Sequence, residues 1–317
     1  MAPKILISYP LPPARIAALN SPYPVECVSG KKPIYEEVCE RIGDFDALLC
    51  MGHPADKQLM DAGSRLKVIS NYGVGYDNVD VAYAKEKGIM VSNLPRSTSA
   101  PTANMAIGLM LSLMLKISLH DRLLRAEQLP KWDLPTSYGS SPGGKLLGIV
   151  GMGRIGKEMA KRARALDMEI CYYKRTRLSP DEEQKHGAIY LELDELLTQS
   201  DVISLHTPLT DSTFHLIGER EIGLMKRTAF LINTARGSVV DNDALIKALQ
   251  ENKIAGAGLD VFPHEPEVPK AYLSMDQVVL TPHAGTATRE SRMDMFNEAF
   301  QNAVDLLDGK EIAARVV

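Results

Sequence analysis

Three short segments each supply one ionisable side chain of a kind that reduction of a keto acid requires. Arg236 lies in Asn-Thr-Ala-Arg-Gly, Glu265 in Pro-His-Glu-Pro, and His283 in Thr-Pro-His-Ala-Gly. A guanidinium can hold a substrate carboxylate and polarise the adjacent carbonyl, and an imidazole can protonate the alkoxide that forms. A carboxylate beside the imidazole would fix its tautomer and favour its protonated form. The three side chains therefore indicate hydride transfer to a 2-keto acid, with His283 as the proton donor.

Each of these residues taken alone also has an ordinary structural interpretation. Arg236 could cap a strand end, Glu265 could be a surface acid, and His283 could be a histidine satisfied within the fold. Asp260 could line a cofactor crevice or simply end a strand. The histidines and the four cysteines show no metal-ligand spacing, so no metal site is predicted.

A glycine-rich loop predicts where the hydride source binds. An apolar run at 147–150 has the pattern of a strand, Gly-Met-Gly-Arg-Ile-Gly follows at 151–156, and an alanine-rich helical segment comes next. This order of strand, turn and helix is typical of dinucleotide sites. Gly151 allows the sharp turn, Gly153 lets the backbone approach a pyrophosphate, and Gly156 lets the helix pack closely on the strand. The helix N-terminus then presents N–H groups to the phosphates.

The residues after the next expected strand decide between the two nicotinamide cofactors. An NAD site has an acid here that binds the ribose hydroxyls. This chain instead has Lys174, followed by Arg175, Thr176 and Arg177. Cations and a hydroxyl suit a dianionic 2′-phosphate, although the cluster could also be a solvated basic strand end. The cluster predicts NADP as the cofactor, with NAD as the alternative.

The first part of the chain alternates short apolar runs with helical segments. This order predicts a parallel sheet flanked by helices. Gly73-Val74-Gly75 follows one of the expected strands, where a glycine pair either presents bare N–H groups to an anion or forms a plain turn. We expect strands at 4–8, 47–51, 66–70 and 89–92, and helices at 14–19, 34–42 and 81–86.

A second α/β series is expected from Lys145 onward. A long helix precedes it, starting at Ala100 with apolar positions at Met105, Leu109, Leu113 and Ile117, and a loop at 127–146 could form an arm that packs on a partner. A last helix is expected at 289–308. The expected strands of this series are 146–150, 169–173, 202–206, 229–233, 256–260 and 278–281.

These elements predict an α/β fold of two Rossmann-like parallel-sheet domains, with the active site in the cleft between them. A length of 317 residues exceeds the usual size of a single core. We expect residues 1–99 plus 287–317 to form the substrate-binding (catalytic) domain and residues 100–286 to form the dinucleotide-binding domain.

Composition narrows the class of protein. The chain is 45% hydrophobic and 24% charged, with a formal net charge of −4, which gives no sign of a nucleic-acid or membrane surface. The longest apolar run is too short to cross a bilayer, and the N-terminus has no signal-peptide pattern. Four scattered cysteines (Cys27, Cys39, Cys50 and Cys171) indicate reduced, buried thiols in a cytoplasmic protein.

Six motifs make the chain resemble the D-isomer-specific 2-hydroxyacid dehydrogenases, and among them the glyoxylate/hydroxypyruvate reductases. The resemblance covers nearly the whole chain and keeps the order of the family's motifs. They are Gly-Val-Gly-Tyr-Asp-Asn (73–78), Gly-Met-Gly-Arg-Ile-Gly (151–156), His-Thr-Pro-Leu-Thr (206–210), Asn-Thr-Ala-Arg-Gly (233–237), Gly-Leu-Asp-Val-Phe-x-x-Glu-Pro (258–266) and Thr-Pro-His-Ala-Gly (281–285).

The resemblance implies a role for each motif. Arg236 would bind the substrate carboxylate and carbonyl, Glu265 would orient His283, and backbone N–H groups of Val74 and Gly75 would hold the carboxylate from the other domain. With the glycine loop and the basic cluster, it gives these cofactor contacts: Thr102, Gly151, Gly153, Arg154, Ile155, Gly156, Lys174, Arg175, Thr176, His206, Thr207, Pro208, Thr213, Thr234, Ala235, Arg236, Asp260, His283 and Gly285.

The expected function is NAD(P)H-dependent reduction of a small 2-keto acid, glyoxylate or hydroxypyruvate, to the D-2-hydroxy acid. The resemblance also implies a homodimer with a loop arm, in which Trp132 could form a wall of the substrate pocket. The alternatives are a dehydrogenase of 3-phosphoglycerate or another D-2-hydroxy acid, and a nucleotide-sensing corepressor-like binding protein of the same fold. A phosphorylated substrate would require extra cations near residues 73–76, where the sequence has none.

Overall fold

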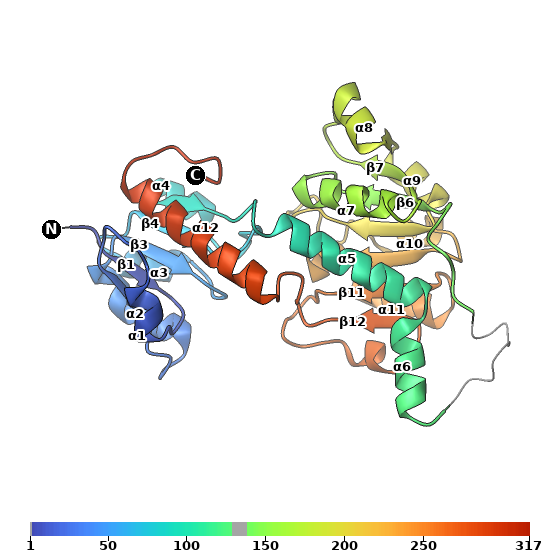
Figure 1. The fold of residues 1–317 in the computed structure, drawn as a ribbon, viewed down its shortest axis with the longest axis horizontal. Coiled ribbons are helices and arrows are strands. Elements are labelled where there is room, and N and C mark those ends of the chain that lie inside the picture. Colours follow the sequence, from blue (N-terminus) through green and yellow to red (C-terminus); the bar gives the residue numbers. More distant parts are fainter. Residues whose placement is uncertain (1, 129–137) are drawn as a thin grey trace. The chain divides into compact units, whose positions relative to one another are not determined.

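The computed structural model of this chain describes residues 2–128 and 138–317, and Trp132 lies outside the described residues. The chain divides into two compact units. Unit 1 consists of Met1–Thr98 and Thr288–Val317, and unit 2 consists of Ser99–Ala287. Each unit is built on a parallel sheet with helices on its faces (Figure 1), which confirms the predicted class of two parallel-sheet α/β domains.

Unit 1 contains a five-stranded sheet in the order β2-β1-β3-β4-β5, and every pairing in it is parallel. The residues of β1, β3 and β4 are buried throughout, as expected for strands covered on both faces. The strands are β1 (Ile5–Ile7), β2 (Val25–Cys27), β3 (Ala47–Cys50), β4 (Val68–Asn71) and β5 (Met90–Ser92).

Helices cover both faces of the unit 1 sheet. Val38, Leu59 and Ala84, from three helices, pack into the core on one face, and the C-terminal helix packs Met295 and Ala299 into the core on the other. Figure 1 shows this last helix, in red, crossing the sheet. The helices are α1 (Pro13–Ala17), α2 (Ile34–Arg41), α3 (Lys57–Ala62), α4 (Val81–Glu86) and α12 (Arg289–Leu307).

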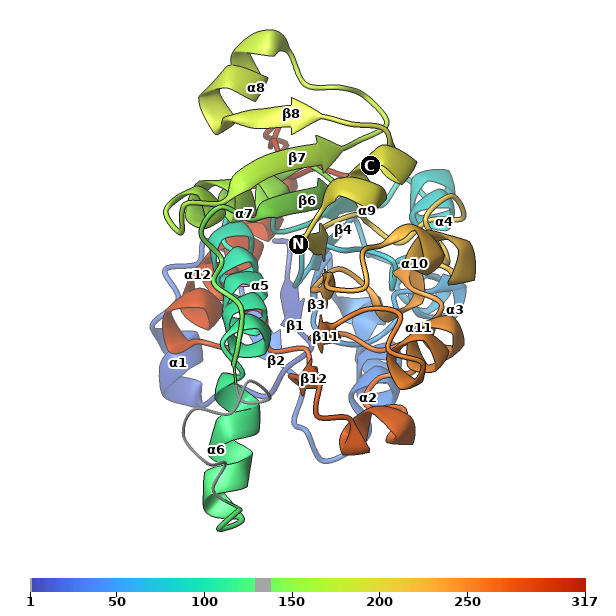
Figure 2. The same cartoon turned by 90° about the vertical axis from the view of Figure 1, so that its right-hand side faces the viewer.

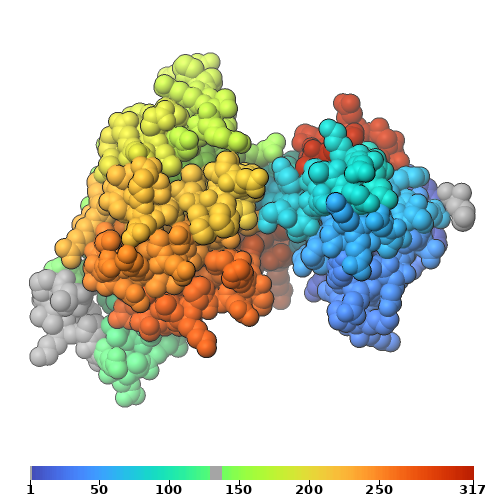
Figure 3. Space-filling view, turned by 180° about the vertical axis from the view of Figure 1, so that it is seen from behind, coloured from blue at the N-terminus to red at the C-terminus, as the bar shows by residue number. Residues whose placement is uncertain are grey.

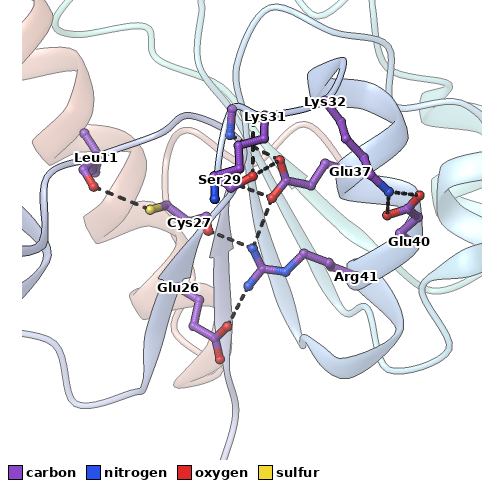
Figure 4. Close-up of polar contacts among 10 residues, drawn as sticks. Leu11, Glu26, Cys27, Ser29, Lys31, Lys32, Glu37, Glu40 and Arg41 are labelled. Atoms are coloured by element: carbon purple, nitrogen blue, oxygen red, sulfur yellow. Dashed lines mark hydrogen bonds and ion pairs between the residues drawn. The ribbon is translucent and has the colours of Figure 1, made fainter.

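Strand β2 was not predicted, and side chains of α2 explain how it forms (Figure 4). Arg41 donates to the Cys27 carbonyl (2.7 Å) and pairs with Glu26 (2.6 Å). Glu37 accepts the N–H (2.5 Å) and the hydroxyl (2.9 Å) of Ser29, and the N–H bond in particular lowers the pKa of Glu37 below its usual value. These tertiary contacts fix a short edge strand that has little apolar pattern of its own.

Unit 2 contains a seven-stranded parallel sheet in the order β12-β11-β10-β9-β6-β7-β8. The four central strands β6, β9, β10 and β11 are almost completely buried. The strands are β6 (Leu146–Val150), β7 (Glu169–Tyr173), β8 (Ala188–Tyr190), β9 (Val202–Leu205), β10 (Phe230–Asn233), β11 (Gly256–Leu259) and β12 (Val278–Leu280).

The helices of unit 2 form two layers, one on each face of its sheet. Helices α5 and α7 pack on one face, and α9, α10 and α11 cover the other (Figure 2). The second layer contributes the yellow and orange surface of unit 2 in Figure 3. The helices are α5 (Ser99–Met114), α6 (Ile117–Arg125), α7 (Arg154–Arg164), α8 (Pro180–His186), α9 (Leu193–Gln199), α10 (Glu219–Leu224) and α11 (Asn242–Gln250).

Three further expectations differ from the structure. The sheet of unit 2 has a seventh strand, β8, an edge strand in which Ile189 is 69% exposed. The long helix ends at Met114 because Lys116 has a φ of +56°, so Ile117 begins the separate helix α6 after a 62° bend. Cys50 and Cys171 are buried as expected, but Cys27 and Cys39 are only partly buried; all four are free thiols.

None of the described helices alone is long and apolar enough to cross a bilayer. Helices α5 and α6 meet this criterion of length and composition only as a bent pair.

Candidate active site

The carboxyl ends of β6 and β9 form the switch point of the unit 2 sheet. The chain leaves β6 toward β7 and β8 on one side and returns through β9 on the other. Open α/β sheets bind ligands at such points. Gly151 follows β6 and His206 follows β9, and the His206 N–H donates to the Val150 carbonyl (2.8 Å). The glycine loop therefore lies beside the 206–208 segment, as a nucleotide site requires.

The three glycines of this loop are needed for different reasons. Gly151 has a φ of +101°, and a Cβ there would lie 2.7 Å from the His206 carbonyl carbon. A Cβ on Gly156 would overlap the carbonyl oxygen of Gly151. At Gly153, the N-cap of α7, a Cβ would meet no described atom within 4 Å. Packing of the described chain does not explain a glycine there, and the open position leaves room for a phosphate to approach the N-terminus of α7.

Three buried polar side-chain atoms near the ends of these strands have no hydrogen-bond partner in the described part of the chain. They are Nδ1 of His206 and the hydroxyl groups of Thr207 and Thr234. An unsatisfied buried polar group is destabilising by about 1–3 kcal/mol, so such groups normally have a partner. All three belong to the predicted cofactor contacts. Their unmet hydrogen bonds and the open position at Gly153 together fit a polar ligand such as a dinucleotide.

His206 cannot compete with His283 for the role of proton donor. Its Nε2 lies 2.9 Å from the Ser204 hydroxyl, and burial lowers the pKa of His206 to about 4. The ring is therefore neutral near pH 7. The loop that follows is closed by Thr213, whose hydroxyl donates to the Pro208 carbonyl (2.6 Å) and accepts the Thr210 N–H (2.8 Å).

The basic cluster after β7 is only partly as predicted. Lys174 is half-buried and Arg175 and Thr176 are exposed, and none of the three has a hydrogen bond or ion pair within the described chain. Arg177 differs, because its guanidinium binds Glu183 of α8 through two contacts of 2.8 and 2.9 Å. The charge of Arg177, which was expected to add to the cluster, is therefore paired with a carboxylate in the described chain.

Arg236 is positioned by the turn that follows β10. The side chain of Asn233 accepts the Ala235 N–H (3.0 Å) and donates to the Arg236 carbonyl (2.9 Å), which closes the turn. A Cβ on Gly237 would overlap the backbone of Phe262, so glycine is required for this turn to lie against the loop after β11. The arrangement brings Arg236 into the loop cluster that also carries Glu265.

Glu265 and His283 form a direct pair in this cluster. Oε2 of Glu265 lies 2.6 Å from Nδ1 of His283, and Oε1 accepts the Phe262 N–H (3.0 Å). Burial opposes ionisation of Glu265, but the bonds from His283 and Phe262 and the charge of Arg236 outweigh it, so the pKa of Glu265 is below its ordinary value. With Nδ1 engaged and 48% of its side chain exposed, His283 presents Nε2 as the atom able to donate a proton.

Asp260 holds the loop that carries His283. Its carboxylate accepts the Thr281 hydroxyl (2.7 Å) and the N–H groups of Ala284 (2.7 Å) and Gly285 (2.9 Å), and its carbonyl accepts the His283 N–H (2.7 Å). Asp260 is 1% exposed, so this structural role accounts for its polar atoms. Thr102 of α5 lies beside the same loop, next to Gly285.

Two asparagine side chains bind backbone carbonyl groups of the 73–78 loop of unit 1. The Val74 carbonyl accepts from the Asn93 side chain (2.8 Å), and the Gly75 carbonyl accepts from the Asn71 side chain (2.8 Å). The N–H groups of Val74 and Gly75 have no acceptor among the described residues. With both carbonyls turned to asparagine amides, the two N–H groups remain available to a carboxylate.

A cation comes near this loop from a distant part of the chain. Helix α12 brings Arg292 next to Tyr72, whose hydroxyl donates to the Arg292 carbonyl (2.9 Å), and the charge of Arg292 opposes the rise in the pKa of Tyr72 that burial causes. The sequence near 73–76 contains no cation, and the fold places Arg292 beside Tyr72, the residue that precedes this segment. No group of three His, Cys, Asp or Glu side chains within residues 2–128 and 138–317 could hold a metal ion.

Several residues that shape the site were not selected from the sequence. Asn71, Asn93 and Asn233 act through amide groups that close turns, and Glu183 acts on the basic cluster. One sequence feature could have identified the asparagines. Each of them ends a strand or directly follows one, and each lies within five residues of a glycine.

Comparison with known proteins gives one consistent result. The family model described as "D-isomer specific 2-hydroxyacid dehydrogenase, NAD binding domain" matches residues 107–285. A glyoxylate reductase of Thermococcus litoralis is 42% identical over 316 residues, which cover 98% of this chain and 95% of that protein.

Solved structures agree with the sequence relatives. A glyoxylate reductase from Paecilomyes thermophila superimposes with a TM-score of 0.89 at 36% identity, covering 99% of this chain and 98% of that one. An NADPH-dependent glyoxylate/hydroxypyruvate reductase from Sinorhizobium meliloti, in complex with NADP and malonate, has a TM-score of 0.85 at 30% identity, covering 100% and 97%. The resemblance inferred from the sequence motifs is therefore confirmed.

Proposed function

The chain belongs to the family of D-isomer-specific 2-hydroxyacid dehydrogenases, and on this premise we propose that it reduces glyoxylate or hydroxypyruvate to the corresponding 2-hydroxy acid. The observation that carries the proposal is the 2.6 Å contact between Glu265 and His283, in a loop cluster that also contains Arg236. The names of the relatives support the substrate class, because the T. litoralis and P. thermophila proteins are both glyoxylate reductases.

Each side chain has a distinct task in this reaction. Arg236 binds the substrate carboxylate and polarises the carbonyl, and the N–H groups of Val74 and Gly75 bind a carboxylate oxygen. His283 donates the proton from Nε2 to the alkoxide as it forms, and Glu265 stabilises the imidazolium before that transfer. Because Oε1 of Glu265 is held by the Phe262 N–H, the carboxylate keeps its orientation through the cycle.

The nicotinamide cofactor supplies the hydride when bound. The residues that would hold it are the glycine loop, the unpaired polar groups of His206, Thr207 and Thr234, and the cations Lys174 and Arg175. We propose that NADPH is preferred, because two cations without described partners stand where an NAD site has an acid. The S. meliloti relative, which is NADPH-dependent, supports this preference, while NADH remains the alternative.

We also propose a cytoplasmic homodimer. Helix α6 has no buried residue. Its Ile117 and Leu124 are 54% and 56% exposed, and Leu115, just before the helix, is 44% exposed. An apolar helix face of this kind needs a partner, and a second copy of the chain is the simplest one. Four free thiols are what a reducing compartment allows. Light scattering on the purified protein, and on a variant with Ile117→Glu and Leu124→Glu, tests the dimer.

A matrix of substrates and cofactors tests the function directly. Rates with glyoxylate, hydroxypyruvate, pyruvate and 3-phosphohydroxypyruvate, each with NADPH and NADH, should be highest for the first two substrates with NADPH. The phosphorylated compound belongs in the panel because Arg292 lies near the 73–78 loop. A best rate with it would favour 3-phosphoglycerate chemistry, and absence of turnover with every acid would favour a nucleotide-sensing binding protein.

A further inference from the structure

Glu183 forms an ion pair with Arg177, one of the three cations in the basic segment 174–177 after β7. Its carboxylate receives Nε (2.8 Å) and Nη2 (2.9 Å) of Arg177. The guanidinium carbon of Arg177 also lies 5.3 Å from the centre of the Tyr190 ring in β8, so the group is held by α8 and β8 together. Lys174 and Arg175, only a few residues away, have no such partner among the described residues.

Tyr172 of β7 fixes Glu183 in this position. Its ring is fully buried, its hydroxyl donates to Oε1 of Glu183 (2.6 Å), and the same oxygen of Tyr172 accepts the Leu178 N–H (2.9 Å). The bonds from Arg177 and then from Tyr172 lower the pKa of Glu183 to about 2, so it is ionised near pH 7. An ionised carboxylate of α8 is thus held against Arg177, near the end of the loop 174–178.

We infer that Glu183 limits how strongly the protein prefers a nucleotide with a 2′-phosphate, because it neutralises Arg177 beside the proposed phosphate site. This inference rests on the proposed function, in which Lys174 and Arg175 receive that phosphate. With Glu183 ionised, Arg177 contributes no net charge to the segment. Loss of the carboxylate adds one positive charge, which favours a dianion such as the 2′-phosphate and leaves NADH, which lacks it, almost unaffected.

The charges removed in three variants predict how the dissociation constant for NADPH changes in each. The constants are measured by fluorescence titration of the purified protein at low ionic strength. Glu183→Gln should tighten NADPH binding about 3- to 10-fold. Arg177→Gln leaves Glu183 unneutralised and should weaken NADPH binding by a similar factor. The double variant has the same net charge as the wild type and should bind NADPH within about twofold of it. NADH binding should change by less than about twofold throughout.

The double variant separates this inference from its main rival. If Arg177 leaves Glu183 and binds the phosphate itself, the double variant will bind NADPH as weakly as Arg177→Gln, which overturns the inference. Unchanged or weaker NADPH binding by Glu183→Gln also overturns it. The gain from Glu183→Gln should shrink as salt is raised from about 20 to 300 mM, because the interaction is partly screened by solvent ions.

A matched control lies on the same helix. Asp181 is exposed in the first turn of α8 and has no ion pair with a described residue, so Asp181→Asn removes a like charge without releasing Arg177. It should change the ratio of NADPH to NADH affinity less than Glu183→Gln does. Melting temperatures check folding, and a small change is expected because Arg177 is 62% exposed.

The outcome for Glu183 can be judged apart from the proposed function. If the wild type binds NADH more tightly than NADPH, the proposed cofactor preference is wrong. The inference about Glu183 concerns only the change between variants, and a 3- to 10-fold shift toward NADPH would still support it.

Discussion

Oε2 of Glu265 lies 2.6 Å from Nδ1 of His283, and the other oxygen of the same carboxylate is held by the Phe262 N–H at 3.0 Å. The carboxylate therefore cannot rotate away from the imidazole without losing a second bond. Two loops that follow neighbouring strands, β11 and β12, are fixed to one another at the residues that carry the proposed proton transfer.

Replacing Glu265 with Gln should lower kcat with glyoxylate by about 10²-fold, the lower range for general acid catalysis. The amide keeps the shape of the side chain but removes the charge that stabilises a protonated His283. Steady-state kinetics at pH 7.5 checks this, and a kcat within about twofold of the wild type would exclude the proposed role of Glu265.

Gly237→Ala should reduce activity by at least about 10²-fold, because its Cβ would overlap the Phe262 backbone and displace the turn that carries Arg236. The matched control is Gly223→Ala in α10, where a Cβ meets no described atom within 4 Å. It should retain full activity and gain up to about 1 kcal/mol in stability. Equal activity of the two variants would show that the Gly237 contact does not position Arg236.

The pKa of His206 predicts that stability depends on pH. Burial lowers it from 6.5 to about 4, so between these values the unfolded chain binds a proton that the folded protein does not. Stability from this residue is complete above about pH 6.5 and is lost as pH falls toward 4, by about 2 kcal/mol at pH 5.

Denaturant unfolding without nucleotide, at pH 7.5 and pH 5.0, measures this effect. The loss of stability between the two values should be smaller for His206→Gln than for the wild type, by about 2 kcal/mol. The exposed histidine variant His264→Gln should behave like the wild type. An equal loss in His206→Gln and the wild type would contradict the prediction.

Asn93→Ala should raise KM for glyoxylate about tenfold, because the Val74 carbonyl loses its 2.8 Å donor and the adjacent N–H groups lose their fixed direction. The dissociation constant for NADPH should stay the same, since Asn93 and Val74 belong to unit 1 and the nucleotide loop to unit 2. Steady-state kinetics and nucleotide titration check the split. An equal loss of both affinities would indicate a general structural defect instead.

Much of the fold could be predicted from sequence because apolar runs and glycine turns are local signals. The bounds of β6 and β7 are the predicted ones. The expected strands at 202–206, 256–260 and 278–281 each end one residue too late, and the one at 229–233 begins one residue too early. Strands β2 and β8 were not found; both are partly buried, and their pairing depends on contacts from other elements.

The residues of the candidate site could likewise be predicted only where the signal is local in sequence. Arg236, Glu265 and His283 could be selected by residue type and by their position after strands, and the contact between the last two is present in the structure. The pairing of Arg177 with Glu183 joins residues six apart through a turn whose geometry the sequence does not reveal. Likewise, Arg292 reaches Tyr72 across 220 residues of sequence, which no local pattern could indicate.

The most direct measurement is a single-turnover reduction of glyoxylate by the NADPH-loaded His283→Asn variant. Asparagine is suitable because His283 has a φ of +52°, a backbone conformation that asparagine adopts more readily than most residues. We predict that NADPH binds within a few-fold of the wild type while the rate of NADPH oxidation falls by about 10³-fold or more. A rate close to that of the wild type, with NADPH bound, would contradict the assignment of His283 as the proton donor.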